Sequence, residues 1–141
     1  VVLITGYSSY DSAVEALDIG ALDYIEKPIK DVELLRQRIR RALSRRDEQM
    51  SRAASATPTP TERRPRILLV ELEGTRRQLL ADYLGRTYEV VAVVDGDEAY
   101  ARIQKEKFDI VLADRNLPGM SGLRVIEQAQ RLLPHCASVL Y

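Results

Sequence analysis

Four side chains that could take part in chemistry stand at the ends of short apolar runs in this chain. They are Thr5, Lys27, Glu71 and Asp114. In a parallel sheet the carboxyl ends of the strands meet at one edge, which is where open α/β proteins bind their ligands. Carboxylates at such an edge suit a hard cation such as Mg²⁺, while a lysine and a hydroxyl suit a phosphoryl group.

The elements that would position these side chains follow an alternating pattern. Short β-branched runs alternate with stretches of helical periodicity, which predicts an α/β fold with a parallel sheet and helices on both faces. Asp31 and Asp97 are expected to cap two of the helices. We expect strands at 1–5, 23–26, 67–70, 90–94, 109–113 and 137–141, and helices at 11–19, from 31 onward, and at 75–84, 97–105 and 121–133.

The helix that begins after Asp31 has two contrasting faces. Its apolar residues recur at helical spacing, which predicts that they face the core: Leu34, Leu35, Ile39, Ala42 and Leu43. Six arginines between positions 36 and 46 fall mostly on the other face, where we expect a solvated surface rather than a nucleic-acid site.

A change in composition divides the chain. Residues 51–66 are rich in Ala, Ser, Thr and Pro and lack apolar periodicity, which predicts a linker. Residues 1–50 and 67–141 then form two separate pieces. Because the chain opens and closes within apolar runs, we interpret it as a segment of a longer protein or as a rearranged chain.

Composition excludes several classes of protein. Twenty-one basic residues balance 21 acidic ones, so no net charge favours nucleic acid or an anionic membrane. No apolar run approaches the roughly 20 residues that span a bilayer. A single cysteine, Cys136, excludes an internal disulfide and suits a cytoplasmic location, and a single histidine, His135, argues against a histidine-rich metal site.

Two motifs together resemble the receiver domains of response regulators in two-component systems. Residues 114–122, Asp-Arg-Asn-Leu-Pro-Gly-Met-Ser-Gly, are similar to the phosphoacceptor loop of that family, and 67–73 to its first strand and acidic pair. Residues 2–7 and 20–28 resemble the second half of a receiver. The resemblance implies a flavodoxin-like fold in which 1–50 is a C-terminal half and 67–141 an N-terminal half, in permuted order.

This reversed order leaves two interpretations. The pieces are either halves of two tandem receivers or halves that fold on each other as one permuted receiver. In the second case the fourth strand of the family is present twice, at 1–5 and at 137–141, and one copy is surplus.

The resemblance assigns a role to each site residue. Asp114 would accept a phosphoryl group from a histidine kinase or phosphotransfer protein. Mg²⁺ would be held by Asp114, Glu71 and the backbone carbonyl of Asn116. Lys27 and Thr5 would contact the phosphoryl oxygens, and Tyr24 would change rotamer with Thr5 as a switch.

Leu72 departs from the family, which has a second acid at this position. Its apolar side chain should weaken Mg²⁺ binding, so a pseudo-receiver that acts by contact without phosphorylation is the alternative. Another receiver or an output domain of the same parent chain is a further expected partner, whereas nucleic acid and membrane are not expected partners.

Two other functions remain as rivals, although the chain is not expected to be an enzyme. A phosphatase of the haloacid dehalogenase type would need a second Asp where Asn116 stands. A flavodoxin-like flavin binder would need a phosphate-binding loop where the acidic side chains of Glu71 and Glu73 stand instead.

Overall fold

One parallel sheet organises the molecule. The computed structural model describes residues 2–5, 23–26, 32–53 and 63–140. Six strands pair in the order β2-β1-β6-β5-β3-β4, and every pair is parallel. This confirms the predicted α/β fold. The strands are β1 (Val2–Thr5), β2 (Asp23–Glu26), β3 (Arg66–Val70), β4 (Glu89–Val93), β5 (Ile110–Ala113) and β6 (Ala137–Leu140).

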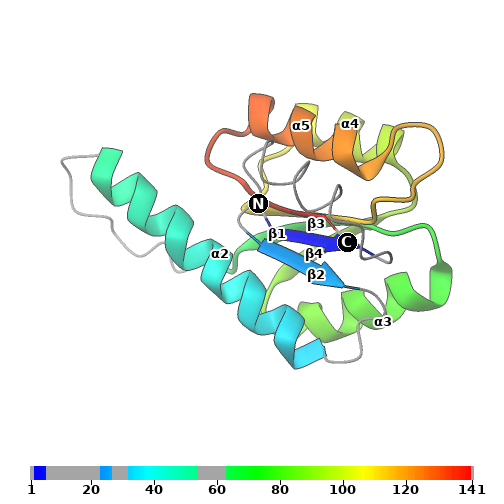
Figure 1. Cartoon of the computed structure of the whole chain (residues 1–141), viewed down its shortest axis with the longest axis horizontal. Helices are drawn as coiled ribbons and strands as arrows, with labels where there is room; N and C mark the ends of the chain where they lie inside the picture. Colours follow the sequence, from blue (N-terminus) through cyan, green and yellow to red (C-terminus); the bar gives the residue numbers. More distant parts are fainter. Residues whose placement is uncertain (1, 6–22, 27–31, 54–62, 141) are drawn as a thin grey trace.

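The described helices cover both faces of this sheet, as predicted. Helices α4 (Gly96–Lys105) and α5 (Gly122–Leu132) lie on one face, and α2 (Val32–Ala53) and α3 (Gly74–Gly85) lie on the other (Figure 1). None of them combines the length and apolar character that crossing a bilayer requires. The helix predicted at 11–19 lies outside the described residues.

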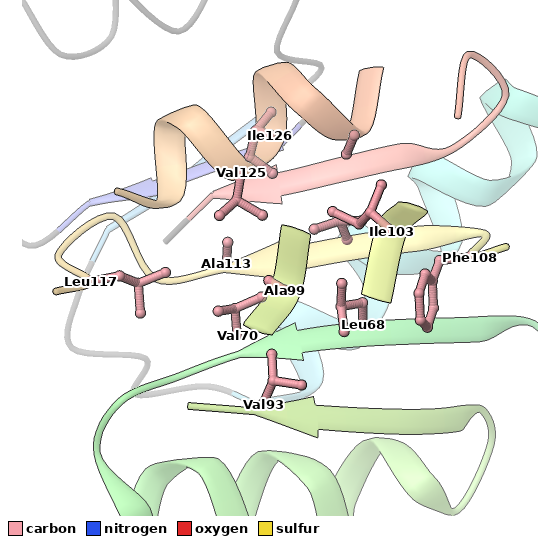
Figure 2. Packing of buried hydrophobic residues seen from close by; sticks show 12 residues of the cluster. Leu68, Val70, Val93, Ala99, Ile103, Phe108, Ala113, Leu117, Val125 and Ile126 are labelled. Atoms are coloured by element: carbon pink, nitrogen blue, oxygen red, sulfur yellow. The ribbon is translucent and has the colours of Figure 1, made fainter. Parts of the chain in front are cut away.

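Strand alternation builds the two halves of the core. On β3, Leu68 and Val70 pack beneath α4 and α5, whereas Ile67 and Leu69 pack toward α2 and α3. Figure 2 shows the first of these clusters, where Val70 and Leu68 lie close to Ala99 of α4. Successive side chains of a strand point to opposite faces, so a strand buried on both sides is apolar throughout.

The apolar runs at the two ends of the chain form neighbouring strands of the sheet. Val2 pairs with Val139 and Leu3 with Leu140, so β1 and β6 are parallel neighbours. Both strands therefore belong to one sheet, and β6 separates β1 from β5. An open sheet edge accepts a further strand because its N–H and C=O groups are unpaired.

Helix α2 packs on the sheet through only part of its predicted apolar face. Leu35, Ile39 and Ala42 are buried against residues of β3 and β5, including Ile67. The prediction for Leu34 was wrong: its side chain is 40% exposed. The helix also continues to Ala53, into the first residues of the predicted linker, of which 54–62 lie outside the described part of the chain.

Arg36 and Arg46 of α2 contact residues outside the helix. Arg46 Nη1 lies 2.6 Å from Asp109 Oδ1, and Arg36 Nη2 donates to Thr87 Oγ1 at 3.2 Å. Asp109 Oδ2 also accepts the N–H of Arg66 at 2.8 Å. The expectation of a solvated arginine face was therefore wrong for these two residues, because Asp109 offers a buried acceptor to Arg46.

Helix α4 begins one residue after its cap. Asp95 Oδ1 accepts the N–H of Glu98 at 2.8 Å, which makes Asp95 the N-cap in place of the predicted Asp97. A cap must have extended backbone dihedrals, and Asp95 has φ −144° and ψ 171°.

Candidate functional site

Glu71 and Asp114 emerge next to each other at the carboxyl edge of the sheet. Val70 pairs with Ala113 across β3 and β5, and the N–H of Asp114 donates to Val70 O at 2.9 Å. The N–H of Glu71 donates to Val93 O of β4 at 3.1 Å. Both residues are buried: Glu71 is fully buried, and Asp114 is 5% exposed. Strand pairing thus brings together two of the acids that the sequence predicted.

A guanidinium joins these two carboxylates. Arg76 Nη1 lies 3.3 Å from Glu71 Oε2 and 3.5 Å from Asp114 Oδ2. Arg76 belongs to the first turn of α3, and its side chain is 41% exposed. It therefore carries a positive charge from the solvent side to a buried acid pair.

The loop between β3 and α3 fixes the position of Arg76. Glu73 is the N-cap of α3, and its carboxylate accepts the N–H groups of Arg76 at 2.7 Å and Thr75 at 2.8 Å. These two hydrogen bonds hold the pKa of Glu73 below its usual value, and the bond from Arg76 has the larger effect. The N–H of Glu73 donates to Glu71 Oε1 at 2.9 Å. Glu73 thus acts as a helix cap, while Leu72 is half exposed.

The loop after β5 holds the other side of the site. The N–H of Asn116 donates to Asp114 Oδ1 at 2.9 Å, which orients this carboxylate. Leu117 is buried in the core, and Gly119 has φ +69°, a conformation that favours glycine. The predicted ligand Asn116 therefore lies beside Asp114 in a loop that is anchored by packing.

The structure describes the remaining predicted site residues only in part. Thr5 ends β1 and pairs with Glu26, and Tyr24 on β2 pairs with Leu3. Because β6 lies between β1 and β5, two strand spacings of about 4.8 Å each separate the backbone of Thr5 from β5. The side chains of Thr5 and Tyr24, and Lys27 as a whole, lie outside the described part of the structure.

The sequence pattern of the response regulator receiver domain matches residues 67–141, which is more than half of the chain. The chain belongs to the response regulator receiver domain family. Receiver domains are signalling modules that interact with histidine kinases or phosphotransfer proteins.

The segments that match this receiver chain are parts of longer proteins. It is 39% identical over 67 residues to the sensor histidine kinase RcsC of Escherichia coli, covering 47% of this chain and 7% of that protein. It is 37% identical over 71 residues to the transcriptional regulatory protein BaeR of Escherichia coli O6:H1, covering 50% of this chain and 30% of that protein. The chain thus spans a small part of the length of these relatives.

Solved structures show the same fold. The chemotaxis response regulator CheY4 of Vibrio cholerae is similar with a TM-score of 0.51 and 29% identity, covering 55% of this chain and 67% of that one. The signal receiver domain of an HD domain-containing protein from Pseudomonas fluorescens Pf-5 has a TM-score of 0.52 and 26% identity, covering 55% and 63%.

Receiver domains bind Mg²⁺ in their active site. Leu72 replaces a carboxylate, and among the described residues no three His, Cys, Asp or Glu side chains form a metal-binding group. Arg76 Nη1 already contacts both acids.

Sequence analysis missed Arg76, although a signal for it was present. The first turn of a helix favours acidic side chains because of the helix dipole, whereas α3 has Arg76 and Arg77 near its start and no acid in its first turn. A basic pair at this unfavourable position, with Arg76 five residues after the strand-end Glu71, is the signal that an acidic acceptor could lie nearby. Arg77 Nη1 donates to the backbone carbonyl oxygens of Glu71 and Leu72 at 3.0 and 3.1 Å.

Proposed function

We propose that this receiver module belongs to a phosphorelay and that Asp114 is its phosphoacceptor. The supporting observation is the placement of the Asp114 carboxylate at the end of β5, with Oδ1 fixed by the N–H of Asn116 and Oδ2 beside Arg76. A carboxylate held at a sheet edge can attack a phosphoryl group as a nucleophile. The donor would be phosphohistidine of a histidine kinase or phosphotransfer protein.

In this step an oxygen of Asp114 bonds to phosphorus, the phosphorus–nitrogen bond breaks, and imidazole leaves. Charge on the transferred group has to be met by preorganised cations. Arg76 Nη1, 3.5 Å from Asp114 Oδ2, is a described cation in position to contribute. Lys27 and Thr5 remain proposed partners of the phosphoryl group, with Tyr24 as the proposed switch, and the intervening β6 makes a direct role for Thr5 less favourable.

A second function is favoured by a different observation. Leu72 removes one acid, and Arg76 covers an Asp114 that is almost fully buried. Both features suit a pseudo-receiver that signals through its surface alone, by contact with another receiver or with an output domain of a longer chain.

Phosphorylation by a small donor distinguishes the two functions. The chain is incubated with acetyl phosphate and with phosphoramidate, and its intact mass is measured. We expect a gain of one phosphoryl group in the wild type and in Asp95→Asn, a matched control that also removes an aspartate following a strand. Asp114→Asn should gain none. Absence of phosphate from the wild type with both donors would overturn the proposal in favour of the pseudo-receiver.

A further inference from the structure

We propose that Arg76 is a built-in counter-cation that occupies the place of a divalent metal between Glu71 and Asp114. Metal can then bind only by displacing the guanidinium. This inference concerns the same site as the proposed function, and it depends on that function only for its consequence in signalling.

The first support is geometric. A single nitrogen, Arg76 Nη1, lies 3.4 and 3.3 Å from the two carboxylate oxygens of Glu71 and 3.5 Å from an oxygen of Asp114. Three oxygens from two strand ends therefore converge on one positively charged group. A bound metal ion would need the same oxygens.

Burial supplies the second support. The side chains of Glu71 and Asp114 are only 1% and 7% exposed, and they come from neighbouring strands. Two ionised carboxylates buried side by side repel each other and lose hydration, so they require a positive partner. Arg76 meets this requirement with one side chain.

The local backbone supports the same conclusion. The N–H of Arg76 is held by Glu73 Oε2 at 2.7 Å, so the start of the arginine side chain is fixed relative to the acid pair. The guanidinium then reaches both carboxylates, against the preference of the helix dipole for acids in this turn. Its position thus depends on the acids and not on the helix alone.

Charge balance links Arg76 to Leu72. In the family pattern three acids and one divalent ion leave one negative charge. Here Leu72 removes one acid, and Glu71, Asp114 and Arg76 together also leave one negative charge. The two departures compensate each other, since the guanidinium replaces both the metal and the acid that it would have neutralised.

A cycle of four proteins tests this compensation: the wild type, Arg76→Met, Leu72→Asp and the double variant. Binding of Mn²⁺ is measured by the electron paramagnetic resonance signal of the free ion, with Mg²⁺ as competitor. We expect Arg76→Met to bind Mn²⁺ at least tenfold more tightly than the wild type. The double variant should likewise bind it at least tenfold more tightly than Leu72→Asp. Arg102→Met removes the same charge from exposed α4 and should leave binding unchanged.

Thermal unfolding gives an independent reading. Because a ligand that binds the folded state raises the midpoint, Mg²⁺ should raise it for Arg76→Met and leave the wild type unchanged. If Arg76→Met is too unstable to study, Arg76→Gln takes its place, since it keeps a hydrogen-bonding amide without the charge.

The outcomes are distinct from those of the phosphorylation test. Equal affinity in Leu72→Asp and the double variant would overturn the role of Arg76, whether or not Asp114 accepts phosphate. Tight Mg²⁺ binding by the wild type would overturn it as well. Failure to gain phosphate, with the tenfold difference intact, would overturn only the proposed function.

Discussion

Two adjacent leucines of α2 offer a direct test of how this helix docks. Leu35 is fully buried in the cluster with Ile67 and Leu112, whereas Leu34 is 40% exposed. Replacing either one by alanine changes the same number of atoms at neighbouring helical positions. Differences in helix propensity between the two variants therefore cancel.

The magnitude follows from burial. Leu35→Ala removes a fully buried side chain and leaves a cavity between helix and sheet, which costs about 3 kcal/mol, within the range of roughly 2–5 for such changes. Leu34→Ala loses part of a transfer free energy of about 2 kcal/mol and leaves no closed cavity, so we expect about 1 kcal/mol. For a chain of this size each kcal/mol lowers the unfolding midpoint by roughly 3–4 °C.

The assay is urea unfolding followed by circular dichroism at 222 nm, with thermal unfolding alongside. We expect a midpoint about 10 °C below the wild type for Leu35→Ala and about 3 °C below it for Leu34→Ala. An unchanged denaturant slope would show that both variants still unfold in the same transition. Equal losses for the two leucines would refute the described packing of α2.

Three further predictions concern other parts of the molecule. An added Cβ at Gly96 would lie 2.0 Å from a backbone oxygen of the β5–α5 loop, so Gly96→Ala should cost about 2 kcal/mol, whereas Gly85→Ala, with open space around it, should be neutral or stabilising in urea unfolding. Desolvation of the partly buried thiol, followed by the charge of Asp109, raises the pKa of Cys136 to about 12, so iodoacetamide at pH 8 should modify the folded chain at least about tenfold more slowly than the urea-unfolded chain; equal rates would contradict the raised pKa. Asp109→Asn should cost about 2 kcal/mol because it leaves the partly buried Arg46 without its anionic partner, and a double-mutant cycle with Arg46→Met should show coupling, whereas additive losses would refute the pair.

Much of the fold was predictable because local patterns and tertiary packing agree. The apolar runs of β3 and β5 are buried on both faces, and such strands have few alternatives once helical segments alternate with them. Ser121 caps α5 at the predicted start because its side chain accepts the N–H of Arg124. The same strands place Glu71 and Asp114 at the carboxyl edge of the sheet, as their positions after two predicted strands indicated.

The other features depend on contacts that periodicity cannot specify. The sequence does not specify that β6 and not β1 pairs with β5, because the two strands have similar apolar runs. The apolar residues from Leu34 to Leu43 span a wider arc than the sheet can cover, so Leu34 remains partly exposed. The role of Arg76 required knowledge of which side chains share the strand ends.

The docking of α2 also has a consequence for the order of assembly during folding. Its contacts join residues far apart in the chain: 63 positions separate Arg46 from Asp109, and 50 separate Glu33 from Tyr83. Contacts of such long sequence separation form late, because the entropy cost of closing a large loop comes before the contacts can stabilise the chain. We therefore expect the β3–β5 region to condense first around short-range βα units, with α3 alone covering one face of the forming sheet until α2 docks beside it.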